Sequence, residues 1–239
     1  TSGDVVFYNE WIEFIKETTI QNPVERRGVD QNLWIWESAD YAREYLITAD
    51  VARGDGKDFS AAHVIDIETN TQVAEFKGQL PPKEFGYFLV GLAAEYNNAM
   101  LCPENANIGW ATLDAIRERG YRNLYHSPKS DKFREFIGDR SVTIRSKRLL
   151  EEMRVFIWKN GRPEAQVGYN DDLIMAFGIA MFLRDTSLKF QQESLDRAKA
   201  ALGNVSKNDY HVPGVVSGRT QNPYTMEING KKENITWLI

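Results

Sequence analysis

The order of its apolar segments constrains the fold of this chain more than any other feature of the sequence. Three short strand-like runs come first, at Tyr45–Ala49, Ala61–Ile67 and Gln72–Lys77, and turn residues separate them. Runs of this length with tight connections predict an antiparallel meander of three strands. The first run ends directly on Asp50, so an acidic residue closes the first predicted strand.

Helices and strands alternate after the meander. Apolar residues recur at intervals of three and four after Pro81-Pro82, which predicts a helix to about Tyr96. The remaining predicted elements are a strand at Ala99–Cys102, a helix at 108–119, a strand at Asn123–His126, a helix at 146–153, a strand at Arg154–Trp158 and a buried helix at Leu173–Leu183. The pattern predicts an α/β domain whose mixed sheet has three antiparallel strands followed by parallel strands, flanked by helices.

The composition divides the chain into three parts. Residues 1–40 mix aromatic and charged residues and are interpreted as a lead-in segment with a short helix near residues 8–18. Residues 41–186 hold the predicted α/β core. Residues 187–239 are interpreted as a C-terminal extension, and after about residue 203 frequent glycine, asparagine and proline indicate loops and weak strands. The sequence starts without methionine, and we expect it to be part of a longer protein.

Several functional classes are disfavoured by the sequence. No apolar run approaches the roughly 20 residues of a membrane helix. Cys102 is the single cysteine, which excludes an intramolecular disulfide and is interpreted as a small buried apolar residue. The three histidines His63, His126 and His211 are scattered, so a zinc site is not expected. The glycine-rich turn at Gly54–Asp58 lacks the spacing and the hydroxyl of an ATP-binding P-loop.

Acidic residues stand beside three of the apolar elements. Asp50 closes the first strand, Glu104 follows the fourth, and Asp171 and Asp172 begin the buried helix. Each has an ordinary structural alternative, as a turn residue, a surface residue or a helix-capping residue. If the first strand lies beside the fourth and the buried helix packs across both, all three sites meet at one edge of the sheet.

Carboxylates gathered in this way point to a hard cation. Close carboxylates repel one another unless they share a divalent ion, and oxygen ligands without a Cys/His cluster select Mg²⁺ or Mn²⁺. Two such ions about 4 Å apart activate a water molecule and stabilise the leaving oxygen of a phosphodiester. The sequence therefore predicts two-metal phosphodiester chemistry.

The charge is unevenly distributed along the chain. The net charge is −5, which taken alone disfavours nucleic acid as a partner. The stretch Arg117–Arg162, however, has 13 basic and 6 acidic residues. The candidate DNA-binding residues in it are Arg122, Lys129, Lys132, Arg134, Arg140, Arg145, Lys147 and Arg148. A solvated helix face is the alternative, but the position between Glu104 and the aspartate pair favours a surface that faces DNA.

Three stretches carry a resemblance to a known family: YLITADVARGDGKDFSAAHVID from Tyr45 to Asp66, AAEYNNAMLCPENANIG at 93–109, and LLEEMRVFIWKNGRPEAQVGYNDDLIMAFGIA from Leu149 to Ala180. With them the sequence resembles the C-terminal nuclease domain of the large terminase subunit of tailed bacteriophages, closest to the T-even type. The resemblance implies a ribonuclease-H-like fold and a metal-dependent endonuclease, using two Mg²⁺ or Mn²⁺ ions, that cuts concatemeric double-stranded viral DNA.

The resemblance also implies residue roles and partners. By position, Asp50, Glu104 and the pair Asp171/Asp172 match the metal ligands, with Asp50 bridging both ions. Asp58 matches a further acidic position, and Lys57 orients water or contacts a phosphate, or is simply a solvated turn lysine. The implied partners are double-stranded DNA and, for the full-length protein, the portal and the small terminase subunit. The implied location is the host cytoplasm at the procapsid vertex, with an ATPase motor preceding residue 1 and no ATPase activity in this part.

Other interpretations stay open from the residues alone. An actin-like or sugar-kinase-like ATPase also sets an aspartate after its first strand, but it needs a second phosphate loop that the sequence lacks. Another nuclease of the same fold, of the resolvase or transposase type, is a second alternative. A non-catalytic docking module for the portal is a third, with Tyr210, Tyr224 and Trp237 of the extension as contact residues.

Overall fold

The structure is a computed structural model that describes residues 4–54, 56, 58–104, 109–125 and 137–183, and the strands at 225–228 and 231–234. The chain divides into two compact units, residues 1–190 and residues 191–239. The candidate site lies in the first unit. None of the described helices is long and apolar enough to cross a membrane.

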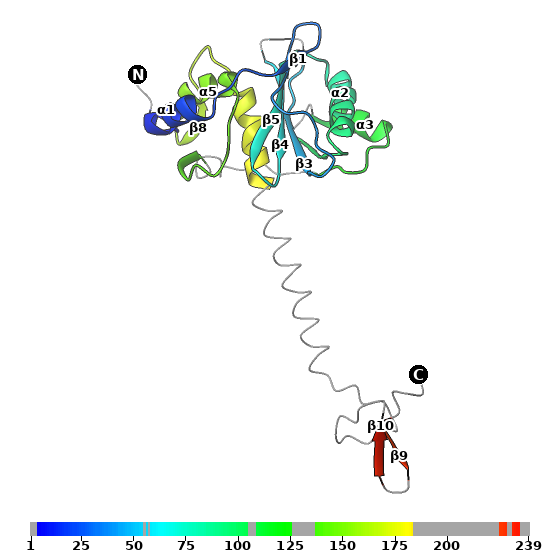
Figure 1. Cartoon of the computed structure of the whole chain (residues 1–239). Coiled ribbons are helices and arrows are strands. Elements are labelled where there is room, and N and C mark those ends of the chain that lie inside the picture. The colour runs from blue at the N-terminus through cyan, green and yellow to red at the C-terminus, as the bar shows by residue number, and fades with distance from the viewer. Residues whose placement is uncertain are drawn as a thin grey trace. The chain divides into compact units, whose positions relative to one another are not determined.

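A six-stranded mixed sheet forms the centre of the first unit (Figure 1). Its strands are β1 (Glu25–Arg27), β2 (Leu33–Ile35), β3 (Tyr45–Asp50), β4 (Ser60–Asp66), β5 (Thr71–Gly78) and β6 (Met100–Pro103). They lie in the order β1-β2-β5-β4-β3-β6. Only β3 and β6 pair in parallel, and the other neighbours are antiparallel. The predicted mixed sheet is confirmed, with the three-strand meander in its middle.

The turn between β4 and β5 shows how the sequence builds this meander. Asp66 ends β4, and its Oδ1 accepts hydrogen bonds from the backbone N–H groups of Glu68 and Thr69. Asn70 follows with a φ of 51°, a left-handed conformation that asparagine tolerates better than most residues. Arg43 binds the other Asp66 oxygen at 2.6 Å. A buried carboxylate is thereby satisfied at the point where the chain reverses.

Helices α2 (Pro82–Glu95) and α3 (Gly109–Glu118) cover one face of the sheet (Figure 1). Phe85 and Leu89 of α2 are fully buried against Ile47 and Val64 of the strands. The helix periodicity predicted after Pro81-Pro82 is confirmed. This apolar layer anchors β3 and β6 from one side and leaves their other face for the remaining helices.

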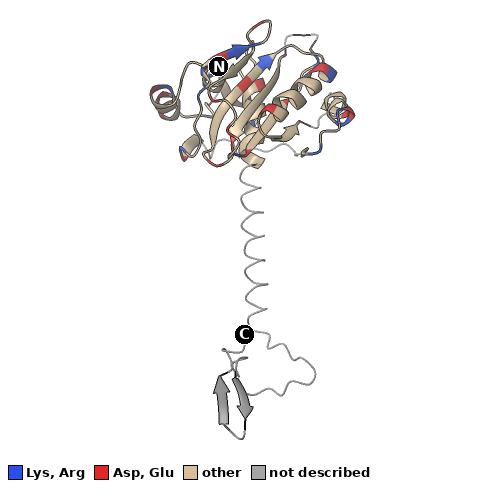
Figure 2. Ribbon diagram, turned by 45° about the vertical axis from the view of Figure 1, so that its right-hand side comes forward, with Lys and Arg blue, Asp and Glu red and all other residues tan. Residues whose placement is uncertain are grey.

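The opposite face is covered by α1 (Asn9–Thr18), α5 (Lys147–Arg154) and a helix that includes residues 172–183. Leu173 and Phe177 of that helix pack with Leu46, Ile65 and Cys102 of the sheet in one buried cluster. Cys102 is buried, as the sequence predicted. Most of the sheet carries neither acidic nor basic residues, which lie chiefly on helices and at strand ends (Figure 2).

The first 40 residues contribute more to the fold than a lead-in segment does. The predicted helix near residues 8–18 is present as α1, and Ile12 and Ile15 bury it against the core. Strands β1 and β2 were not predicted, because three-residue strands are too short to show a periodic pattern. Trp36 follows β2, is buried, and donates a hydrogen bond to the Gln21 carbonyl at 2.9 Å.

Two further segments differ from the sequence expectation. The strand expected at Asn123–His126 is reduced in the described residues to a single parallel bridge between Leu124 and Leu101. The strand expected at Arg154–Trp158 is β7 (Phe156–Lys159), which forms a hairpin with β8 (Arg162–Ala165). The second strand was missed because its sequence, Arg-Pro-Glu-Ala, has no apolar alternation.

In the second unit, β9 (Thr225–Ile228) and β10 (Lys231–Asn234) pair as an antiparallel hairpin. Weak strands were expected in this extension. Tyr210, Tyr224 and Trp237, the proposed portal contacts, lie outside the described residues.

Candidate metal centre

Asp50 and Glu104 stand at the carboxyl ends of two neighbouring parallel strands. Asp50 is the last residue of β3, and Glu104 directly follows β6. The register pairs Ala49 with Pro103, and the backbone N–H of Glu104 donates to the Ala49 carbonyl at 2.8 Å. The expectation that the first strand of the meander lies beside the strand before Glu104 is confirmed.

Both side chains belong to the sheet face that packs against the helix of residues 172–183. Side chains alternate along a strand, so Asp50 shares a face with Leu46 and Glu104 shares one with Cys102. Leu46 and Cys102 lie in the buried cluster with Leu173 of the helix. The two carboxylates therefore lie at the edge of the core that this helix closes.

The helix of residues 172–183 begins with Asp172, the second residue of the predicted aspartate pair. Asp172 is 8% exposed, and within the described structure its Oδ2 atom accepts no hydrogen bond. The nearest cation is the Lys77 Nζ, 3.5 Å from Oδ2. Burial raises the pKa of the Asp172 carboxyl, although Lys77 and the Asn170 side chain act in the opposite direction. Asp171 is only half-buried.

Lys77 links this helix start to the strand that carries Asp50. The register places Asp50 opposite Ala61 and Ala61 opposite Lys77, so the three residues form one row across β3, β4 and β5. Neighbouring strands lie about 4.8 Å apart, so the Cα atoms of Asp50 and Lys77 are roughly 10 Å apart. Asp172, which contacts Lys77, therefore lies at the same edge of the sheet as Asp50.

The carboxylates lie along one edge and do not form a closed ligand cluster. Among the described side chains, no group of three His, Cys, Asp or Glu residues is close enough to hold one metal ion. The buried Asp172 Oδ2 without a hydrogen bond and the oxygen-only set of side chains nevertheless fit a hard divalent cation. A buried polar atom of this kind is costly unless a partner satisfies it.

Glycine residues let the chain pass close to these carboxylates. Gly109 begins α3, and a Cβ atom there would overlap the carbonyl oxygen of Glu104. Gly54, in the turn after Asp50, has a φ of 78°, and a Cβ there would lie 2.6 Å from the Leu80 carbonyl oxygen. Substituting either residue would therefore displace the backbone beside a candidate ligand.

Glu152 is a site residue that the sequence did not reveal. Its Oε2 atom accepts hydrogen bonds from the backbone N–H groups of Leu173 at 3.0 Å and Ile174 at 3.2 Å. These are first-turn N–H groups, which have no partner within their own helix. The Glu152 carboxylate, from α5, therefore caps the helix that carries Asp172, and neither Asp171 nor Asp172 is needed as a side-chain cap.

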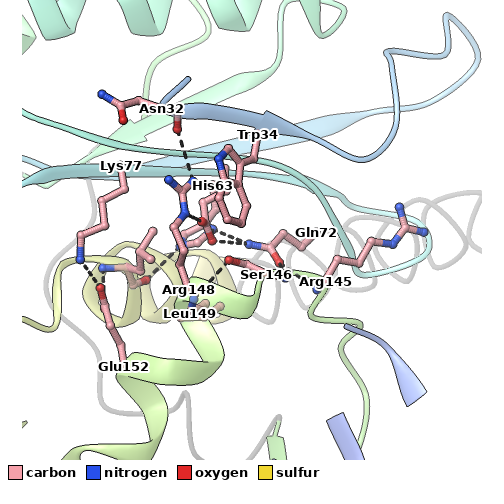
Figure 3. A network of polar contacts seen from close by, with 12 residues as sticks. Asn32, Trp34, His63, Gln72, Lys77, Arg145, Ser146, Arg148, Leu149 and Glu152 are labelled. Carbon is pink, nitrogen blue, oxygen red and sulfur yellow. Dashed lines mark hydrogen bonds and ion pairs between the residues drawn. The ribbon is translucent and has the colours of Figure 1, made fainter. Parts of the chain in front are cut away.

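Glu152 also accepts a hydrogen bond from Lys77 (Figure 3). Burial raises the pKa of the Glu152 carboxyl to about 7, with Lys77 and the Ile174 N–H opposing the shift and Asp172 adding to it. Lys77 thus lies between two buried carboxylates. A lysine within a predicted strand was the only sequence signal, and the pairing residue is 75 positions away.

A buried polar network continues from this point along the same face (Figure 3). The His63 Nε2 lies 3.0 Å from the Leu173 carbonyl, and its Nδ1 lies 2.9 Å from the Gln72 amide nitrogen. The Gln72 Oε1 accepts hydrogen bonds from the backbone N–H groups of Arg145 and Ser146, both at 2.9 Å. The network therefore fixes the start of α5 to β5 and the helix of residues 172–183 to β4.

Two of the predicted DNA-binding residues donate hydrogen bonds to carboxylates. The Arg148 Nε donates to Glu75 at 2.8 Å, and the Arg145 guanidinium donates to Glu37 at 2.5 Å. Arg148 also lies 3.8 Å from the centre of the Trp34 ring. Their positive charges are therefore partly compensated within the protein.

The other basic residues occupy different environments. Arg140 lies over the Phe14 ring at 4.0 Å, while Lys147 and Arg122 are exposed. Asp58, the secondary acidic candidate, is also exposed, in the segment before β4. Four predicted residues lie outside the described part of the chain, namely Lys57, Lys129, Lys132 and Arg134.

Comparison with solved structures identifies the fold. The large terminase nuclease from thermophilic phage G20c with bound magnesium matches with a TM-score of 0.63 and 19% identity, over 75% of this chain and 97% of that chain. The Thermus phage P74-26 large terminase nuclease domain matches with a TM-score of 0.60 and 20% identity, over 74% and 94%. The fold is that of the phage large terminase nucleases. No protein family matches the sequence itself, and neither does any curated protein.

Proposed function

We propose that this chain is a metal-dependent endonuclease of a phage large terminase, of the T-even-like type, that cuts concatemeric double-stranded DNA during genome packaging. One observation carries the proposal. Asp50 and Glu104 end adjacent parallel strands beneath a helix whose first residue, Asp172, has a buried oxygen that no described group hydrogen-bonds. The fold shared with terminase nucleases supports it, and magnesium is bound in one of those structures.

Asp50, Glu104 and Asp172 would hold the divalent ions, two Mg²⁺ or Mn²⁺. When bound, the ions would activate a water molecule and stabilise the leaving oxygen of the phosphodiester. Asp172 is the stronger ligand candidate of the aspartate pair, because it is buried next to Lys77 while Asp171 is half-buried. Asp171 then serves the helix start, where its carbonyl accepts from the Met175 N–H at 2.9 Å.

The other residues position this group. Glu152 holds the first turn of the helix that carries Asp172. Lys77 compensates the charge of both carboxylates and supplies the nearest cation for a phosphate that approaches them. The DNA-binding surface includes Lys147 and Arg148 of α5, which begins on the same face. In the full-length protein we place the portal and the small terminase subunit as partners, in the host cytoplasm at the procapsid vertex.

The test is plasmid cleavage by Asp50→Asn in Mg²⁺ or Mn²⁺, with and without chelator. We expect cleavage to fall by more than about 100-fold, since loss of a residue that merely supports a metal ligand already costs about 10–100-fold. The melting temperature and circular dichroism should stay close to those of the wild type. Asp114→Asn, at an exposed position of α3, removes the same charge and should cut normally.

Cleavage by Asp50→Asn at the wild-type rate would overturn the metal-site assignment. Cleavage by the wild type that persists in excess chelator would overturn the role of the divalent ions. A folded wild type that binds a portal ring but cuts no DNA with either ion would favour the docking-module alternative.

A further inference from the structure

A second cavity on the face of Asp50 has a different chemical character from the carboxylate edge. Its volume is about 530 Å³, and its lining residues are Ile20, Gln21, Asn22, Arg26, Trp34 and Lys147. Two cations, two amides and an indole ring surround it, and no described lining residue is acidic. Such a lining favours an anion with several oxygen atoms.

Arg26 is the cation in this cavity with the least compensation. Among the residues that the structure describes, it makes no ion pair, and its guanidinium lies 4.6 Å from the centre of the Trp34 ring. The Lys147 side chain is 72% exposed, and the one carboxylate it reaches within the described part of the chain is that of Glu151, at 3.9 Å. Contact with an aromatic face orients a guanidinium without neutralising its charge. The two cations are therefore available to an external anion.

The strand register connects this cavity with the candidate metal centre. Arg26 lies opposite Trp34, and Trp34 lies opposite Glu75, two residues before Lys77 on the same face of β5. Lys77 in turn shares a row with Asp50. Four strand spacings of about 4.8 Å separate β1 from β3, or roughly 19 Å. At about 3.4 Å per phosphate along one strand of a duplex, this distance corresponds to roughly five or six base pairs.

Arg148 lies between the candidate metal centre and the second cavity. It lines a separate cavity of about 400 Å³ together with Lys77, Tyr169 and Asn170, next to the carboxylate edge. The same guanidinium lies over Trp34 (Figure 3). The basic side chains of Lys77 and Arg148 thus lie between the candidate metal centre and the second cavity. The carboxylates Glu151 and Glu152 line the cavity next to the candidate metal centre and do not line the second one.

We propose that the second cavity binds a backbone phosphate of duplex DNA roughly five or six base pairs from the scissile bond, with Arg26 and Lys147 as its anchors. This inference rests on the proposed nuclease function and specifies how its substrate is held. The amides of Gln21 and Asn22 can donate further hydrogen bonds to phosphate oxygens. Contacts of this kind fix the register of the duplex and carry no sequence information.

The experiment compares two double variants of the full chain. Arg26→Gln/Lys147→Gln removes the two anchors. Lys83→Gln/Arg119→Gln removes the same charge from α2 and the segment after α3, on the opposite face of the sheet. Binding to a 30-base-pair duplex is measured by fluorescence anisotropy in chelator, over a range of salt concentrations. We expect the first variant to bind about tenfold more weakly at low salt, with a log–log salt slope smaller by about 1 to 2.

Equal affinities and equal salt slopes for the two double variants would overturn the proposal. Full displacement of the duplex by inorganic phosphate or a nucleoside monophosphate at millimolar concentration would also overturn it, because the cavity would then be a small-anion site. The proposed function is tested separately, since Asp50→Asn should bind the duplex normally. If Asp50→Asn cuts like the wild type while the anchor variant binds weakly, the nuclease assignment fails and the phosphate contact stands.

Discussion

The two faces of the central sheet are built on different principles. Under α2 and α3 the buried side chains are almost all apolar, with Phe85 and Leu89 packed on Val64 of β4. Under α5 and the helix of residues 172–183, the same strand buries His63, and β5 buries Gln72 and Glu75. Both faces bury an apolar cluster, and the face that holds the candidate site accepts buried polar groups as well.

The polar face is tolerable because its groups satisfy one another. Burying a polar group costs free energy unless it finds a hydrogen-bond partner. Gln72 bonds both to the His63 ring and to the Glu75 carboxylate, and Arg148 bonds to the other Glu75 oxygen. Within the described structure, the buried atoms of this face that depart from the rule include Thr48 Oγ1, Arg145 Nε and Asp172 Oδ2, and we place a metal ion at the last of them.

The largest effect on stability is expected on the apolar face. Phe85→Ala should lower the free energy of unfolding by about 3–5 kcal/mol, because a fully buried ring leaves a cavity. Denaturant unfolding measures this loss. Plasmid cleavage by the fraction that remains folded should be unchanged, and a selective loss of cleavage would show that the two faces are not independent.

An intermediate effect is expected where the polar face holds the helix of residues 172–183. Glu152→Ala should destabilise by about 1–3 kcal/mol, because it leaves the first-turn N–H groups of Leu173 and Ile174 without their acceptor. Glu152→Gln keeps a carbonyl acceptor and should lose less. The measurement is denaturant unfolding of both variants, together with their cleavage rates at a temperature where each is folded.

The comparison of these two variants separates capping from charge. If the alanine and glutamine variants lose the same stability, the cap contributes nothing and the ion pair with Lys77 accounts for the effect. Cleavage should fall more in Glu152→Ala than in Glu152→Gln, since the cap positions Asp172.

The smallest effect concerns the pH dependence of the polar face. Burial lowers the pKa of His63, with Glu75 and the Leu173 carbonyl opposing the shift and Arg148 adding to it. The native histidine therefore stays neutral while the unfolded one takes up a proton below about pH 6.5. Its contribution to stability is complete above that pH and is lost as the pH falls.

The matching variant is His63→Gln, which has hydrogen-bonding groups but does not titrate. Between pH 7.5 and pH 5.5, the wild type should lose more unfolding free energy than this variant, and denaturant unfolding at both values gives the difference. Equal pH dependence of the two proteins would show that His63 does not titrate differently in the native and unfolded states.

Much of the fold was readable from local pattern. The run Tyr45–Ala49 became β3 and ended on Asp50, as predicted, and the periodicity after Pro81-Pro82 became α2. Strands β1 and β2 were not readable, because three residues carry no period. Their place in the sheet depends on pairing with β5, which comes about 40 residues later in the chain.

The residues of the candidate site were likewise only partly predictable from the sequence. The carboxylates Asp50, Glu104 and the pair Asp171/Asp172 were selected from the sequence because each adjoins an apolar element. Lys77 and Glu152 were not selected, although Lys77 contacts Asp172 and Glu152 caps the helix that begins with it. A lysine in a strand and a glutamate in a helix look like solvated residues until the packing that buries them is known.

The sequence by itself determined most of the longer elements and the acidic residues that border them, because helix and strand periodicity, turns and apolar runs are local properties. The tertiary structure alone decided that β3 pairs in parallel with β6, that Glu152 caps the helix of residues 172–183, and that Arg26 shares a sheet face with Asp50. Such pairings join segments tens of residues apart, and their free energy arises from burial and hydrogen bonds that exist only once the chain has folded.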